Sequence, residues 1–167
     1  MRVLLRRWRD SDREPFAALN ADPEVMRYFP STMTREQSDA MVDWAGGLLD
    51  ERGWGLWAVE VPGVAPFVGF VGLNVPSFMP EVVEVGWRLA KEPRGHGYAT
   101  EAAREALRVG FEDVGLDEIV SFTSVPNVPS QRVMQRIGMT HEPTRDFDHP
   151  NVPEGPLKRH VFYAISR

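Results

Sequence analysis

The most constraining feature of this sequence is the stretch from Val82 to Gly110, which changes from one backbone pattern to another within a few residues. Residues 82–89 are rich in β-branched and aromatic side chains and lack a helical period, which predicts a buried strand. Small and apolar residues then recur on one helical face between positions 99 and 114, which predicts a long helix. The chain must therefore turn sharply between a strand and a helix at residues 94–99.

That turn contains two glycines, Gly95 and Gly97, which allow a tight bend and leave backbone N–H groups exposed at the start of the helix. Such groups, together with the partial positive charge of a helix N-terminus, bind phosphate. A purely structural glycine turn is the alternative. The predicted phosphate-binding residues are Arg94 as a charged support and the backbone N–H groups of Gly95, His96, Gly97, Tyr98 and Ala99.

Other phosphate-binding motifs do not match the spacing. A dinucleotide-binding fold needs a third glycine three residues after the second, where this chain has Thr100. It also needs an acidic residue at the end of the next strand, whereas Asp117 precedes that strand. A Walker loop requires Gly-Lys-Ser/Thr, which the sequence lacks.

Three segments together resemble a known family. They are Glu84-Val85-Gly86-Trp87-x-Leu89, then Arg94-x-x-Gly97-x-Ala99, and downstream Asn127-x-x-Ser130-x-x-Val133-Met134-x-x-x-Gly138-Met139. In this order they resemble the GNAT superfamily of acyl-CoA-dependent N-acetyltransferases, in the version seen in RimJ/RimL-type enzymes. The resemblance runs from about Arg2 to the C-terminus and is strongest over residues 82–139.

The order of patterns along the chain predicts one domain over residues 1–167, with a mixed sheet and helices on both faces. The resemblance implies an α/β (α+β) fold of the GNAT type, with about seven mostly antiparallel strands and a splay between the two central ones. Further strands are predicted over residues 3–8, 54–61, 67–75, 118–124 and 157–165, with one more within 139–148. Further helices are predicted over residues 11–19, 34–52 and 127–137.

Two details of packing are predicted as well. Thr34 and Gln37 form a capping box for the 34–52 helix, whose buried face is expected to hold Met41, Trp44, Ala45 and Leu48. The arginines around the first strand are expected to form a solvated edge; they are Arg2, Arg6, Arg7 and Arg9.

The resemblance also implies how the cosubstrate acetyl-CoA is held. Its pantetheine arm adds to the central strand like an extra strand, and backbone N–H groups near Leu89 and Ala90 are the expected oxyanion donors. Asn127 resembles the residue that hydrogen-bonds the pantetheine arm. Ser130 resembles the residue near the sulfur and is a candidate donor to the departing thiolate. The alternative for Asn127 to Ser130 is a capped helix start alone.

Glu84 is the best candidate for a general base, because a carboxylate among the apolar residues of a strand is expected to have a raised pKa that suits proton transfer. The alternative places Glu84 on an exposed face or in an ion pair with Arg88 on the same side of the strand.

The resemblance implies transfer of an acetyl group to a primary amine by direct attack in a ternary complex. The chain has no cysteine, which argues against a covalent acyl-enzyme. The acceptor is either a protein N-terminal α-amine or a small amine such as an antibiotic, an amino acid or a polyamine. A non-catalytic acyl-CoA-binding module on the same fold is the alternative from a different class.

Composition predicts the partners and the cellular location of the protein. The net charge of −5, without a basic block, argues against nucleic acid as a partner. No apolar run approaches the ~20 residues of a membrane span, and the polar N-terminus does not fit a signal peptide, so a cytoplasmic location is expected. No three metal ligands have suitable spacing, so no metal is expected. The resemblance makes a homodimer an open possibility.

Overall fold

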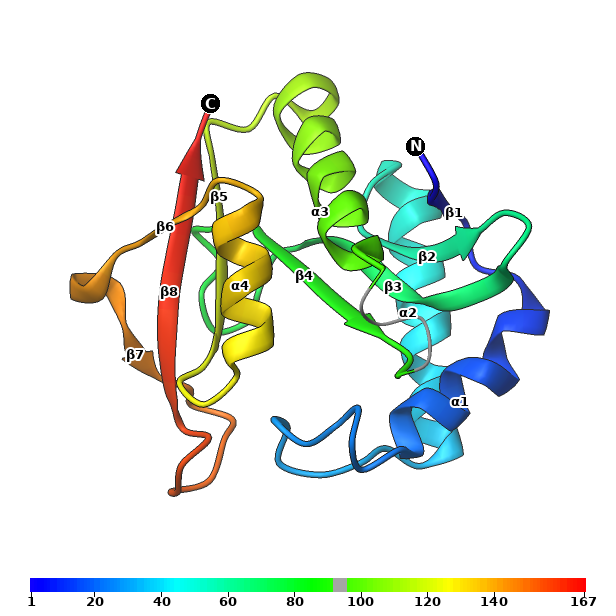
Figure 1. Cartoon of the computed structure of the whole chain (residues 1–167), viewed down its shortest axis with the longest axis horizontal. Coiled ribbons are helices and arrows are strands. Elements are labelled where there is room, and N and C mark those ends of the chain that lie inside the picture. The colour runs from blue at the N-terminus through cyan, green and yellow to red at the C-terminus, as the bar shows by residue number, and fades with distance from the viewer. Residues whose placement is uncertain (92–95) are drawn as a thin grey trace.

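The computed structural model describes residues 1–91 and 96–167, which form one twisted eight-stranded sheet with helices on both faces (Figure 1). The strand order is β1-β2-β3-β4-β5-β8-β6, and β7 pairs with β8. β4 and β5 are parallel and every other pair is antiparallel. The predicted mixed, mostly antiparallel sheet is confirmed. The strands are β1 Leu4–Arg6, β2 Leu56–Val61, β3 Ala65–Asn74, β4 Glu84–Leu89, β5 Glu118–Ser124, β6 Thr140–His141, β7 Phe147–Asp148 and β8 Arg159–Ser166.

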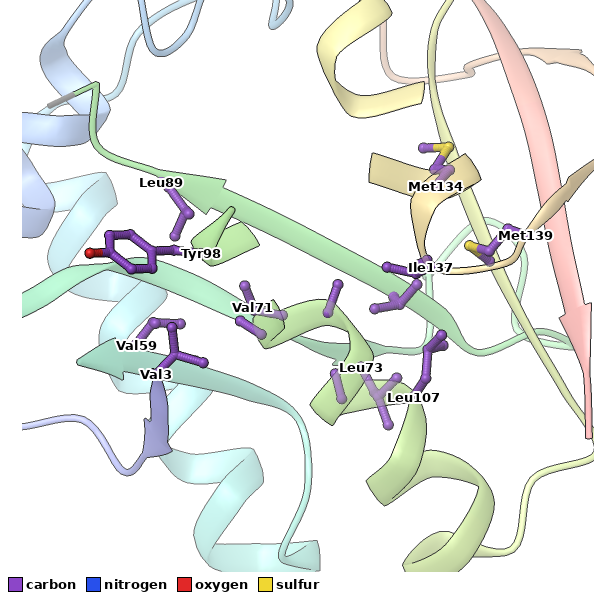
Figure 2. Packing of buried hydrophobic residues seen from close by; sticks show 14 of the residues in the cluster. Val3, Val59, Val71, Leu73, Leu89, Tyr98, Leu107, Met134, Ile137 and Met139 are labelled. Carbon is purple, nitrogen blue, oxygen red and sulfur yellow. The ribbon is translucent and has the colours of Figure 1, made fainter. Parts of the chain in front are cut away.

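The helices divide between the two faces of the sheet. α3 and α4 lie on one face, and α2 lies on the other (Figure 1). Val71 of β3 and Leu89 of β4 pack in one core with Leu107 of α3 (Figure 2). Phe70, on the opposite face, packs in a second core with Phe16 of α1. The α-helices are α1 Arg13–Ala21, α2 Arg35–Arg52, α3 Tyr98–Arg108 and α4 Val128–Arg136; the short helices are η1 Asp10–Asp12, η2 Val109–Val114 and η3 Pro143–Arg145.

α2 begins and ends as predicted, but its buried face differs. Thr34 Oγ1 accepts a hydrogen bond from the Gln37 amide at 3.2 Å, and Gly53 ends the helix in the left-handed region with φ of 81°. The predicted face is wrong for Trp44, which is 46% exposed, and confirmed for Ala45, which is fully buried. The helix is rotated by about one residue, because the Ser38 hydroxyl binds the buried Asn20 amide inside the fold. The residues buried from α2 are Ser38, Val42, Ala45 and Leu49.

The arginines near β1 are not all at a solvated edge. The Arg6 side chain is only 9% exposed and lies 2.9 Å from a carboxylate oxygen of Asp12 and 2.9 Å from one of Glu60. The prediction is wrong for Arg6 because the carboxylate of Asp12 turns back onto β1, where it accepts from the guanidinium, instead of capping α1.

The sheet splits between its two central strands, as the resemblance implied. Among the described residues, one residue of β4 is paired with one of β5: Glu84 with Val120. The Val120 amide donates to the Val83 carbonyl at 2.9 Å, and Ser121 Oγ donates to the Val85 carbonyl at 2.9 Å. Beyond these bonds the two strands diverge, and α4 lies in front of the opening (Figure 1).

No helix within residues 1–91 and 96–167 has both the length and the apolar character needed to cross a bilayer.

Candidate active site

A cavity of about 880 Å³ lies where β4 and β5 diverge. Both faces of the sheet contribute to it, because the splay joins them. From the face of α3 and α4 it is lined by Tyr98, Trp87, Asn127 and Ser130. From the opposite face it is lined by Glu84, Arg88, Phe29, Met41 and Trp44. A cavity of this size and mixed lining is large enough for a small-molecule site.

The backbone of β4 offers hydrogen-bond donors to this cavity. The Ala90 amide donates to the Val68 carbonyl at 2.8 Å, which fixes the alternation of the β3–β4 ladder. In an antiparallel pair successive residues point their N–H groups to opposite sides, so the amides of Trp87 and Leu89 point toward β5. Of the two predicted donors, the Leu89 amide faces the opening and the Ala90 amide is already bonded within the sheet. Trp87 was not among the predicted donors.

The predicted phosphate turn leads into α3. Arg94 and Gly95 lie outside the described residues. Gly97 is the N-cap and has a φ of 77°, a conformation that favours glycine. The Glu101 amide donates to the Gly97 carbonyl at 3.0 Å, so the preceding amides of the first turn have no carbonyl four residues back within the helix. Tyr98 and Ala99 line the cavity, while the exposed His96 stacks its ring on Tyr98 at 5.4 Å between centroids.

Arg2 is a basic residue that the sequence analysis did not place at this turn. Its guanidinium lies 5.0 Å from the centroid of the Tyr98 ring and 3.0 Å from a carboxylate oxygen of Glu101. One of its nitrogens is 3.4 Å from the position that a Cβ at Gly97 would occupy. The residues just before β1 therefore bring a guanidinium, paired with Glu101, to the start of α3, through a contact 99 residues apart in sequence.

The start of α4 is held by Asn127. Its Oδ1 accepts from the Ser130 amide at 3.3 Å, and its Nδ2 donates to Thr123 Oγ1 at 2.9 Å. The side chain thus caps α4 and joins it to the end of β5, on the wall of the cavity.

Ser130 is joined to the central strand through Trp87. The indole Nε1 donates to Ser130 Oγ at 3.3 Å. An indole N–H only donates, so Ser130 acts as acceptor in this bond and its own hydroxyl proton remains free to donate to another group. The position of Trp87 in its strand gave no sign of this contact.

Glu84 lies on the cavity wall, half-buried, at the point where β4 and β5 still pair. Burial disfavours the charged carboxylate and raises the pKa of Glu84 to about 7, although a hydrogen bond from Asn74 Nδ2 at 3.1 Å partly opposes this rise. The alternative pairing with Arg88 is not observed, because Arg88 Nη1 donates to Asn20 Oδ1 at 2.8 Å. A carboxyl group with this pKa is half ionised near neutral pH and can accept a proton there.

Asn74 provides a test of this electrostatic setting. Replacing Asn74 with leucine removes the donor that favours the ionised form of Glu84, so the pKa of Glu84 rises further. The ionisation of Glu84, followed by NMR of its side-chain carboxyl carbon, then shifts to higher pH by about half a unit or more. An unchanged midpoint in Asn74→Leu would contradict the role given to this hydrogen bond.

The histidines on the wall do not form a metal site. His149 and His160 lie 5.0 Å apart between ring centroids, and burial lowers the pKa of His149 to about 4, so its ring is neutral at pH 7. In the described parts of the chain, before residue 92 and after residue 95, no three His, Asp or Glu side chains converge on a common point.

Comparison with known proteins identifies the family. Residues 2–140 match the acetyltransferase (GNAT) domain family. The chain belongs to the GNAT family of acetyltransferases. GNAT acetyltransferases use acetyl-CoA, so this chain is an acetyl-CoA-dependent N-acyltransferase, as the motifs predicted.

Individual GNAT relatives agree with this assignment. The "FsC-acetyl coenzyme A-N(2)-transacetylase" of Aspergillus fumigatus is 33% identical over 93% of this chain and 69% of its own length. The protein YkkB of Bacillus subtilis is 33% identical over 89% of this chain and 88% of its own length. The crystal structure of a GNAT acetyltransferase from Bacillus anthracis superposes with a TM-score of 0.83 at 28% identity, covering 99% of this chain and 95% of that one.

Proposed function

We propose that this GNAT acetyltransferase transfers an acetyl group from acetyl-CoA to a primary amine by direct attack in a ternary complex. The observation that carries the proposal is the opening between β4 and β5, onto which the amides of Trp87 and Leu89 point. These amides are free to bind an extended amide chain such as pantetheine on one side. Glu84 lies on the acceptor side of the same cavity.

The residues on the cofactor side of the cavity have separate roles. The amide of Leu89 stabilises the thioester carbonyl oxygen as it gains charge, and Asn127 binds the pantetheine arm. Ser130 donates its free hydroxyl proton toward the departing thiolate. The amides of residues 95–99, supported by Arg94, bind the pyrophosphate, and the nearby Arg2 adds positive charge.

On the acceptor side Glu84 accepts the proton of the substrate ammonium, directly or through water, and the neutral amine attacks the carbonyl carbon. The bond between that carbon and sulfur then breaks, the thiolate of CoA leaves, and the attacking nitrogen, cationic after the attack, passes its second proton to that thiolate. A thiolate with a pKa of about 8.5 leaves readily, which keeps the demand on Ser130 small.

The proton-transfer step favours an α-amine as acceptor. The pKa of an α-amine, ~8, lies closer to that of Glu84, about 7, than does the ~10.4 of a lysine-like amine, so an α-amine gives up its proton at lower cost. A protein N-terminus and a small molecule with an α-amine both meet this requirement.

Release of free thiol from acetyl-CoA tests the proposal. We expect release in the presence of at least one member of a panel of N-terminal peptides, amino acids, aminoglycosides and polyamines. Binding of CoA without thiol release for any of these acceptors would instead support a non-catalytic module.

A further inference from the structure

Arg88 is placed to face the acceptor. Side chains alternate along a strand, so Glu84, Gly86 and Arg88 share the face of β4 that is covered by the core of α1 and α2. A Cβ at Gly86 would meet nothing within 4 Å, so the floor between the two charged side chains is open. Both Glu84 and Arg88 line the cavity.

The observed contacts of Arg88 are with uncharged groups. Its Nη1 donates to Asn20 Oδ1 at 2.8 Å and contacts the sulfur of Met33 at 3.5 Å. The rings of Phe29 and Phe70 lie 4.6 and 5.2 Å from the guanidinium carbon. Across residues 1–91 and 96–167, no carboxylate lies within ion-pair distance of Arg88, and its Nε is buried without a hydrogen-bond partner.

A buried guanidinium without a carboxylate is costly, because it has lost its hydration and gained only partial compensation. Burial accordingly lowers the pKa of Arg88 to about 10. Arg6 shows the usual solution, since it lies within 2.9 Å of carboxylate oxygens on both Asp12 and Glu60. Arg88 instead faces a cavity whose acceptor-side carboxylate, Glu84, is bonded to Asn74. An anionic group of a molecule bound in the cavity can therefore pair with Arg88.

We propose that Arg88 binds a carboxylate of the acceptor, so that the acceptor is an amino acid or a similar small molecule with both a free amine and a free carboxylate. This rests on the proposed function. The planar guanidinium matches a carboxylate, and binding would supply the counter-charge that Arg88 lacks. The positive charge of Arg88 also favours the neutral form of a nearby amine, which makes it easier for Glu84 to remove the amine's proton. A polyamine would bring a cation to Arg88 and is disfavoured.

Glu84 and Arg88 lie on the same face of β4, on either side of Gly86, and both line the cavity. One small molecule that carries both an amine and a carboxylate can therefore contact both groups within this cavity. In a protein N-terminus the first carboxyl group is an amide and carries no charge for Arg88.

The test compares a panel of amino acids with their carboxamides, using thiol release by the wild type and by Arg88→Gln. The exposed Arg35, which pairs with Asp39 on α2, provides the matched control Arg35→Gln. For the preferred amino acid we expect Arg88→Gln to lower kcat/KM by roughly 30-fold to 1,000-fold. For the corresponding carboxamide we expect a change below about threefold. Comparing ratios between enzymes cancels the difference in pKa between the two amines.

Several outcomes would overturn the inference. Arg88 does not bind a carboxylate if Arg88→Gln lowers kcat/KM equally for acid and carboxamide. The same conclusion follows if the wild type prefers carboxamides or spermidine. In both cases the proposed function stands. Arg88→Lys keeps the charge and loses the planar fork, so it should retain an intermediate preference even if Arg88→Gln does not fold.

A binding measurement separates this inference from failure of the acetyltransferase assignment. Calorimetry with CoA present would use N-acetylated amino acids and their carboxamides, which require no turnover. Binding of the acids by the wild type and its loss in Arg88→Gln would support the carboxylate site even if no thiol is released from acetyl-CoA. Equal affinity of the wild type for acid and carboxamide, or no binding of either, would refute it.

Discussion

Replacing Glu84 with glutamine lowers kcat/KM at pH 7 by about 10²-fold to 10⁴-fold, the usual effect of removing a general base. Wild-type activity rises with pH through the ionisation of Glu84 at about 7, and this limb is absent in the variant. Alkaline pH partly restores the variant, because more of the amine is then neutral without help. Initial rates of thiol release between pH 5.5 and 9.5 measure this profile.

The same substitution has an opposite effect on stability. The pKa of Glu84 is raised in the folded state, so folding favours the protonated form and wild-type stability falls as pH rises from about 4.5 to about 7. Glu84→Gln removes this pH-dependent loss of stability. Its free energy of unfolding is therefore up to about 3 kcal/mol higher than that of the wild type at pH 8, and equal to it at pH 4.

The exposed Glu81 gives the control for both effects, since Glu81→Gln should leave activity and stability near wild type. An unchanged pH–rate profile in Glu84→Gln would remove Glu84 from the mechanism.

Replacing Gly69 with alanine destabilises the fold by more than about 3 kcal/mol. Gly69 lies in β3 with a φ of 136°, and a Cβ there would sit 2.1 Å from the carbonyl oxygen of Arg88 and 2.8 Å from the Cα of Leu89. Because these are backbone atoms, β4 has to move at the residues that face both acceptor and cofactor. Affinity for CoA falls together with the free energy of unfolding, measured by denaturant titration.

Gly46 on α2 provides the control, because a Cβ there would meet nothing within 4 Å. Gly46→Ala is expected to stabilise the protein by about 0.5–1 kcal/mol through helix propensity. A Gly69→Ala variant with wild-type stability would contradict the close approach of β3 and β4.

Features set by neighbouring residues could be predicted from the sequence. The capping box of Thr34 and Gln37 depends on residues three apart, and the turn at Gly97 depends on one residue's conformation. The face of α2 could not be predicted in the same way. Its rotation depends on Ser38 meeting Asn20, and Trp44 consequently lines the cavity instead of the core.

The sequence predicted the position of motif residues that lie within one strand, since Glu84 and Leu89 both line the cavity. Arg88 was read only as a partner for Glu84, because nothing local shows that Asn20 and Phe29 surround it. The bonded state of the Ala90 amide follows only from the register of β4 with β3. The position of Arg2 beside the start of α3 follows only from its contact with Glu101. These are long-range contacts, which periodicity does not encode.

A crystal structure of the protein with CoA tests the central claim most directly. The account predicts the pantetheine arm in the opening between β4 and β5, hydrogen-bonded to the amides of Trp87 and Leu89. It also predicts the thiol near Ser130 and the pyrophosphate at the turn before α3. CoA bound elsewhere on the protein, with the opening between the two strands filled by side chains, would contradict the account.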